Sequence, residues 1–433
     1  MIPTTSMFRA SAPAKSTRNL ITLSALDGSQ PDLALSVTEA LDSKDQNVIF
    51  KGSRGPERIQ LPKPNELLKP DACTQAQSTP RHFSLLAMEI HGHDLLIGPT
   101  EYEAMGGEAL QSHHPRDPLA PWPVNTKFSQ RLLADEQLSA RILSSVRHLL
   151  GTVSLQKPST IMRLDMTIDG ATLEPVAVII NSHLRLLPDP DGSHDEILIH
   201  TIPGSYESLV ALSLSDLNVH VDRSRDRGET NRVNFNELAS SYNDLFDDMP
   251  QNQLLERLAK EYSWAGRILD VGCGTGMFGR ILKGYSPESI LEGLDASESM
   301  VMSPDITEHY QGPIRIGDME KMLLDWVSVD HIVCFSVFQY VDYVTFLATV
   351  AQMFCVAKQS VTFDVVDISQ EYLDMLSMGS EYERLLPVNN VPAIRRFKLP
   401  PRWKKVLETR VIAYVEPEFG TEVFSYYFRF ERT

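Results

Sequence analysis

Arg267-Ile-Leu-Asp-Val-Gly-Cys-Gly-Thr-Gly-Met-Phe-Gly279 reads as a buried strand, a glycine-rich turn and the start of a helix. The glycines let the backbone approach a ligand at positions where a Cβ atom would collide with it. The first N–H groups of the following helix have no partner within the helix and can bind a polar ligand. This order of elements is typical of the opening of a Rossmann-type βαβ unit. A tight turn without a ligand is the alternative.

Polar residues follow at the ends of two later predicted strands. Asp295 ends the strand predicted for 289–295. It lies about 20 residues beyond the glycines, where a nucleotide-binding fold places a carboxylate that accepts hydrogen bonds from ribose hydroxyls. The strand predicted for 330–336 runs into Val337-Phe-Gln-Tyr-Val341. The loop after this strand lies at the carboxyl edge of the sheet, where open α/β sheets bind ligands. The alternative to a ribose-binding role for Asp295 is that its side chain caps the N-terminus of the following helix.

The Gly-x-Gly-x-Gly spacing, with Asp270 just ahead of it, resembles motif I of class I S-adenosylmethionine-dependent methyltransferases. The resemblance covers 235–433 in the family's order. The two strands predicted for 405–414 and 422–432 are similar to the antiparallel hairpin that closes the methyltransferase sheet. The implied fold is α/β, a Rossmann-like methyltransferase sheet preceded by a smaller α+β domain, and the implied cofactor is S-adenosylmethionine.

The resemblance assigns site residues by position. It implies that Asp295 holds the ribose, Asp318 the adenine amino group and the N–H of Met319 a ring nitrogen, with Ser336 beside the sulfur. The residues implied to bind the cofactor are Asp270, Gly272, Cys273, Gly274, Gly276, Asp295, Ala296, Met300, Asp318, Met319 and Ser336. Those implied to face the acceptor are Tyr242, Gln339 and Tyr340, for which ordinary packing is the alternative.

The catalytic residue is not identified from the sequence. Methyl transfer needs a base only where the nucleophile must lose a proton. Tyr242, Tyr340 and His331 are the candidates by position, and His331 lies in a strand that should be buried, which favours a structural role. No metal-ligand constellation is visible, so we predict no metal.

Length and composition bound the class of protein. With 433 residues, two domains and a tail are expected. The formal net charge of −17 argues against non-specific binding to nucleic acid or an anionic membrane. No apolar run reaches membrane-spanning length. The four cysteines show no metal-ligand spacing, which favours a reduced intracellular protein.

We predict a cytoplasmic location. The alternative is mitochondrial, because the first 26 residues hold basic and hydroxyl residues and no acid.

The predicted domains are a largely disordered region, 1–80, an α+β accessory domain, 81–221, a linker, 222–233, and the methyltransferase domain, 234–433. In the accessory domain Leu138, Ile142 and Val146 recur at helical spacing, ahead of a predicted three-stranded meander. That arrangement resembles half of a PAS-type sensor domain. The alternative is a fused domain that shapes the substrate pocket or mediates a homodimer.

The leading functional hypothesis is methyl transfer to a small-molecule acceptor, whose reacting atom, O, N or C, is left open. Two alternatives remain. One is a regulatory protein that binds S-adenosylmethionine without turnover, and the other is a protein methyltransferase. RNA as the substrate is disfavoured by the acidic charge.

Overall fold

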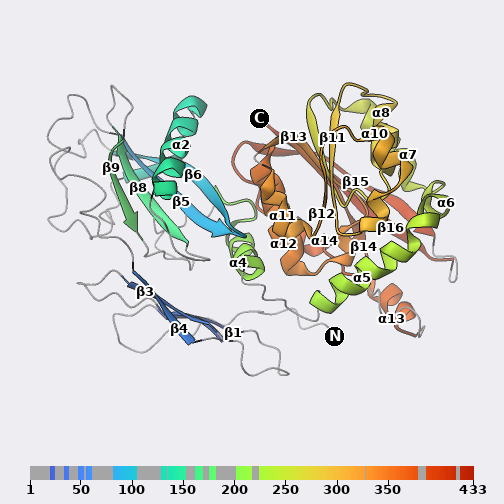
Figure 1. Cartoon of the computed structure of the whole chain (residues 1–433), viewed down its shortest axis with the longest axis horizontal. Coiled ribbons are helices and arrows are strands. Elements are labelled where there is room, and N and C mark those ends of the chain that lie inside the picture. Colours follow the sequence, from blue (N-terminus) through green and yellow to red (C-terminus); the bar gives the residue numbers. More distant parts are fainter. Residues whose placement is uncertain are drawn as a thin grey trace. The chain divides into compact units, whose positions relative to one another are not determined.

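The computed structural model describes residues 20–24, 34–38, 47–52, 55–60, 81–104, 128–133, 135–152, 161–168, 175–181, 201–216, 224–326, 328–378, 387–415 and 420–433. The chain divides into two units, 1–198 and 199–433, which we describe separately (Figure 1).

The first unit contains two antiparallel sheets. The smaller sheet has the order β1-β2-β3-β4. Its strands are β1 (Leu20–Ser24), β2 (Ala34–Thr38), β3 (Asn47–Gly52) and β4 (Gly55–Gln60). These strands lie in the region that the sequence predicts to be largely disordered, so the described part of 1–80 contains regular structure.

The larger sheet has the order β7-β6-β5-β8-β9. Its strands are β5 (Arg81–Ile90), β6 (His93–Ala104), β7 (Phe128–Leu132), β8 (Met162–Ile168) and β9 (Pro175–Asn181). Helix α2 (Glu136–Thr152) packs Leu138, Ile142 and Val146 into its core with Phe83 and Leu164. The helical spacing of these residues is therefore confirmed. The PAS-like assignment and the homodimer remain predictions.

The second unit is built on a seven-stranded sheet with the order β12-β11-β10-β13-β14-β16-β15. Its strands are β10 (Arg267–Val271), β11 (Ile290–Asp295), β12 (Ile314–Ile316), β13 (Val329–Cys334), β14 (Ala357–Asp367), β15 (Trp403–Val415) and β16 (Glu422–Arg432). The first five in sheet order are parallel, and β16 is antiparallel to both β14 and β15. The predicted Rossmann-like sheet with a closing hairpin is confirmed.

Helices cover this sheet, as Figure 1 shows. Before the sheet come α4 (Ser205–Asp216), α5 (Ser224–Leu238), η3 (Ala239–Ser241), α6 (Tyr242–Phe246) and α7 (Gln251–Glu261). Between the strands come α8 (Met277–Lys283), α9 (Glu298–Val301), α10 (Pro304–His309), α11 (Met319–Met322), η4 (Leu323–Asp325), η5 (Phe338–Tyr340), α12 (Tyr343–Val356), α13 (Gln370–Met378) and α14 (Val391–Arg396).

The central strands are buried on both faces. Ile268, Leu269 and Val271 of β10 are fully buried, as are Ile332 and Val333 of β13. Continuous apolar runs of this kind are what a parallel sheet covered by helices on both faces requires. The loops that leave the carboxyl ends of these strands are thereby held on a rigid base.

The segment predicted as a linker, 222–233, is helical from Ser224 onward and belongs to the second unit. Its helix, α5, contacts α9 and η5, next to the ends of β11 and β13. The preceding helix, α4, packs on α12 and buries Leu209 and Leu212. The second unit thus starts before the predicted methyltransferase boundary, and the remaining domain limits stay predictions.

Candidate active site

The glycine turn after β10 has a backbone that suits glycine. Gly272, Gly274 and Gly276 have φ angles of +73°, +53° and +89°, in the left-handed region that side chains disfavour. A Cβ atom on Gly272 would collide with the side chain of Val337. The N–H of Gly272 donates to the carbonyl of Leu294 at 2.6 Å. The turn is therefore fastened between the ends of β11 and β13.

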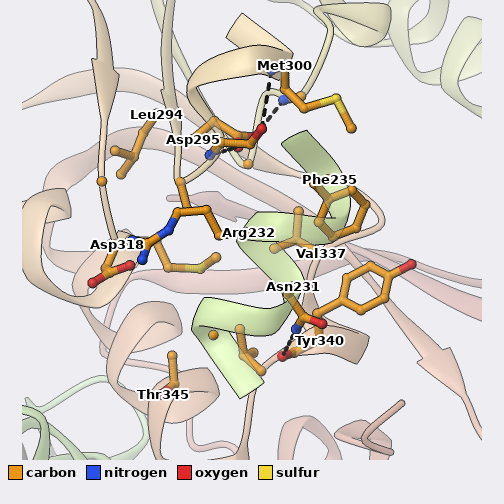
Figure 2. Close-up of a pocket in the computed structure, with 18 of the residues that line it drawn as sticks. Asn231, Arg232, Phe235, Leu294, Asp295, Met300, Asp318, Val337, Tyr340 and Thr345 are labelled. Atoms are coloured by element: carbon orange, nitrogen blue, oxygen red, sulfur yellow. Dashed lines mark hydrogen bonds between the residues drawn. The ribbon is translucent and has the colours of Figure 1, made fainter. Parts of the chain in front are cut away.

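A cavity of about 680 Å³ lies at the carboxyl ends of β10 to β13. Its size falls in the range of small-molecule and cofactor sites. Figure 2 shows side chains from α5 and from the loops after β11, β12 and β13 around it. The structure brings most of the predicted site residues together there. Those that line the cavity are Tyr242, Gly272, Gly274, Asp295, Ala296, Met300, Asp318, Met319, Ser336 and Tyr340.

Four predicted site residues are not among those that line the cavity: Asp270, Cys273, Gly276 and Gln339. Cys273 is buried in the core behind the turn, as a free thiol. Gly276 forms the N-cap of α8. Gln339 is buried and donates from Nε2 to the carbonyl of Ser336 at 3.0 Å. Cys273 and Gln339 therefore point away from the cavity that their neighbours in the sequence line.

The Asp295 carboxylate fixes the glycine turn from the neighbouring strand. Its Oδ2 accepts from the N–H of Gly274 at 2.7 Å, and its Oδ1 accepts from the N–H of Ser297 at 2.8 Å. Burial raises the pKa of this carboxyl, and the backbone N–H donors oppose the rise. Each carboxylate oxygen can accept more than one hydrogen bond, so Asp295 retains acceptor capacity toward the cavity that it lines.

Asp318 lies at the start of α11, after β12. Its side chain is about 40% exposed and pairs with Lys321 at 2.8 Å. Figure 2 shows the Arg232 side chain extending toward Asp318. The part of the cavity that lies after β12 therefore contains a carboxylate acceptor, Asp318, next to the backbone of Met319.

Helix α5 supplies five cavity residues that are not among the predicted site residues: Gly228, Glu229, Asn231, Arg232 and Phe235. Phe235 packs edge-on against the ring of Tyr340, with the centroids 5.1 Å apart. Asn231 is buried and donates from Nδ2 to the carbonyl of Tyr340 at 3.2 Å. The helical spacing of Asn231, Phe235 and Leu238 is the signal that the predicted linker continues into the helix that starts the methyltransferase domain.

Two asparagines fasten the segment from α5 to α6 onto the loops below it. The Oδ1 atom of Asn236 accepts from the Ser297 hydroxyl at 2.7 Å, and that of Asn243 accepts from the Thr275 hydroxyl at 2.6 Å. Thr275 lies within the glycine turn. The segment therefore covers the same loops that bear Gly274 and Asp295.

The candidate bases differ in position. Tyr242 and Tyr340 line the cavity, and burial raises the pKa of both hydroxyls. His331 is buried within β13, its Nδ1 lies 2.7 Å from the Ser360 hydroxyl, and burial lowers its pKa. The burial expected for His331 is confirmed, and His331 is not among the residues that line the cavity.

Asp270 lies beneath the glycine turn and has one buried partner. The Tyr310 hydroxyl donates to its Oδ2 at 2.6 Å. Burial raises the pKa of Asp270 to about 7, and the hydrogen bond from Tyr310 opposes the rise. A carboxyl whose pKa is higher in the folded state contributes stability below its unfolded pKa, and this contribution is lost as the pH rises through the folded value.

Tyr310→Phe is therefore expected to destabilise the protein more at pH 8 than at pH 5.5. At pH 8 the buried Asp270 carboxylate loses its hydroxyl donor, which should cost about 1–3 kcal/mol. At pH 5.5 the carboxyl is protonated and the loss should be smaller. Urea unfolding at both pH values measures this, with the exposed Tyr285→Phe as the control. An equal loss at both pH values would contradict the assignment.

Among the described residues, no group of three or more His, Cys, Asp or Glu side chains is arranged to hold a metal ion. Nor does any helix in the described part of the chain combine the length and apolar character needed to cross a membrane. The cellular compartment stays a prediction.

Comparison with known proteins supports the reading of the second unit. Residues 268–360 match the family model described as a methyltransferase domain. A malonyl-[acyl-carrier protein] O-methyltransferase of Bacillus cytotoxicus is 33% identical over 113 residues, 25% of this chain and 39% of the relative. The enzyme of the same name from Halalkalibacterium halodurans is 36% identical over 91 residues, 20% of this chain and 33% of the relative. The chain thus spans well under half the length of these curated relatives.

Two solved structures align with part of this chain at low similarity. Magnesium protoporphyrin IX methyltransferase from Synechocystis PCC 6803 with bound SAH aligns with 42% of this chain and 81% of its own, at 13% identity and a TM-score of 0.32. A SAM-dependent methyltransferase from Anabaena variabilis ATCC 29413 aligns with 48% and 95%, at 12% identity and a TM-score of 0.32. Similarity at these TM-scores is too weak to support a functional assignment.

The strand order with its closing hairpin, the glycine turn and the family match agree on one assignment. The second unit of this chain contains a class I methyltransferase domain.

Proposed function

We propose that this chain is an S-adenosylmethionine-dependent methyltransferase that acts on a small-molecule acceptor. The observation that carries the proposal is that the glycine turn, Asp295 and Asp318 face one cavity. A Cβ at Gly274 would meet no atom within 4 Å. The backbone there is thus open for a ligand to approach, which fits the amino-acid end of the cofactor.

In this proposal the cofactor supplies a methyl group bound to positively charged sulfur. Asp295 accepts hydrogen bonds from the ribose hydroxyls, and Asp318 with the N–H of Met319 binds the adenine edge. Helix α5 lines the same cavity. Since the leaving group is neutral, much of the rate enhancement can come from holding the acceptor in line with the methyl group.

The cavity tyrosines favour an acceptor that is already nucleophilic. Burial raises the pKa of Tyr242 and Tyr340, so both hydroxyls stay protonated near neutral pH and are poor general bases. They can hydrogen-bond an acceptor without deprotonating it. Carboxylates, thiolates and unprotonated amines satisfy this requirement. The two curated relatives are named as O-methyltransferases of a malonyl group on a carrier protein, and a carboxylate acceptor would be of this class.

Two measurements test the proposal. Isothermal titration with S-adenosylhomocysteine should show saturable binding. Incubation of cell extract with the protein and tritiated S-adenosylmethionine should then label the small-metabolite fraction. Label in the macromolecular fraction would favour a protein methyltransferase or an acceptor group carried on a protein, and binding without any label would favour a regulatory protein. Absence of binding would contradict the proposed cofactor site.

A further inference from the structure

Ser336 has an unusual backbone for a residue with a side chain. It follows β13, lines the cavity and has a φ of +59°. A non-glycine residue persists in the left-handed region only where its surroundings hold it there, and such residues cluster at functional sites. The groups that hold Ser336 therefore determine the position of the loop that carries Val337 and Tyr340.

Both backbone polar groups of Ser336 are held by buried side chains. Its N–H donates to Oδ1 of Asp364 at 2.6 Å, and its carbonyl accepts from Nε2 of Gln339 at 3.0 Å. Asp364 lies in β14 and is about 1% exposed. Its Oδ2 accepts from the Ser425 hydroxyl of β16 at 2.7 Å. The carboxylate thus connects the loop to two strands of the sheet.

We propose that Asp364 is a positioning residue, whose carboxylate clamps Ser336 in its left-handed conformation and so sets the cavity wall next to the glycine turn. This proposal rests on the proposed function only because S-adenosylhomocysteine is the ligand used to test it. Val337, the next residue in this wall, packs against Gly272, where a Cβ atom would collide with the Val337 side chain. Displacing Ser336 would move Val337 and alter both sides of the cavity.

The charge of Asp364 is balanced by hydrogen bonds. The titratable groups that face it are Cys334 on β13, Tyr340 on η5, Tyr427 on β16 and Tyr242 on α6. Burial raises the pKa of each, so all four are neutral near pH 7. Burial also raises the pKa of Asp364, to about 6, and the bonds from Ser425 and Ser336 oppose the rise.

A neutral side chain of the same shape should preserve part of the clamp. In Asp364→Asn the amide oxygen can still accept from the Ser336 N–H, and the amide nitrogen can donate to the Ser425 hydroxyl. Asp364→Ala removes the acceptor and leaves the Ser336 N–H without its partner. A hydrogen bond with an ionised acceptor is about twice as strong as a neutral one. Affinity should therefore fall in the order wild type, Asn, Ala.

The test is a double-mutant cycle between Asp364→Ala and Ser336→Gly, read as the Kd for S-adenosylhomocysteine. Glycine adopts a positive φ without a Cβ penalty, so it needs no clamp. Asp364→Ala should weaken binding about 10- to 100-fold with Ser336 present. In the Ser336→Gly background it should weaken binding by less than about 3-fold. Asp364→Asn should lose only a few-fold in either background.

Asp330→Ala is the matched control. The Oδ2 of Asp330 also accepts from a backbone N–H, that of Arg267 at 2.9 Å, but Asp330 is not among the cavity residues. Its Kd should stay within about 2-fold of wild type. Equal losses from Asp364→Ala in both backgrounds, or no loss in either, would overturn the clamp. No binding by the wild type would instead contradict the proposed function. Urea unfolding of the wild type, Asp364→Ala, Ser336→Gly and their double variant would then measure the coupling of the pair, and absence of coupling would overturn the clamp.

Discussion

Gly274→Arg is expected to abolish S-adenosylhomocysteine binding and to leave the fold intact. Gly274 lines the cavity, and a Cβ there meets no atom within 4 Å. The arginine side chain would therefore extend into the space assigned to the cofactor without displacing the core. We expect a loss of more than about 100-fold in affinity. The positive φ of +53° at this position adds a folding cost of about 1–2 kcal/mol.

Isothermal titration measures the affinity, and circular dichroism with thermal unfolding measures the fold. Gly284→Arg is the matched control, because it adds the same side chain at an exposed glycine that ends α8. That variant should bind like the wild type. If Gly274→Arg bound with unchanged Kd, the cavity beside the glycine turn would not be the cofactor site.

Asp295→Ala is expected to weaken S-adenosylhomocysteine binding by about 100-fold or more. Hydrogen bonds to a charged group are worth about 1.5–3 kcal/mol each, and the ribose offers two hydroxyls. The substitution also removes the acceptor of the Gly274 and Ser297 N–H groups, so the turn would lose its support. Adenosine, which carries the same ribose, should lose affinity in parallel.

Titration of both ligands against wild type, Asp295→Ala and Asp295→Asn separates the effect of the side-chain charge at position 295 from the effect of its shape. The Asn variant should lie between the other two, since it keeps one acceptor oxygen. Glu298→Ala removes an exposed carboxylate three residues away and serves as the control. Unchanged adenosine affinity in Asp295→Ala would show that this carboxylate does not hold the ribose.

The sequence predicted the parts of the site that depend on local geometry. A strand, a glycine turn and a helix in succession determine where Gly272 and Gly274 lie, and the strand that ends at Asp295 is adjacent in the sheet. Asp318 was implied by the family resemblance, and its strand, β12, pairs with β11. These residues line one cavity, as the pattern implied.

Residues that depend on long-range packing were harder to predict. Cys273 and Gln339 stand next to cavity residues in the sequence, but both side chains are buried behind the wall. The sequence does not specify which face of a loop points inward. Asp364 offered a clearer signal, since a carboxylate within the apolar run of β14 needs buried partners. Those partners, Ser336 and Ser425, come from distant segments.

The first part of helix α5 was predicted as a linker for a different reason. The run from 222 to 233 alternates charges and has few apolar residues, so its composition indicated a connector. The helix is stabilised instead by contacts of Asn231 and Phe235 with Tyr340. Tertiary contacts of this kind override a weak local preference.

Helix α5 also determines where the chain can be divided. A fragment that began at residue 234 would cut this helix within its last turns and would lack Asn231 and Arg232. The binding crevice of this fragment would be exposed to solvent on the side that α5 lines, even though every strand of the sheet was present. The shortest fragment that keeps the whole cavity wall starts before Ser224. Because α4 packs on α12, we expect such a fragment to start at about residue 199.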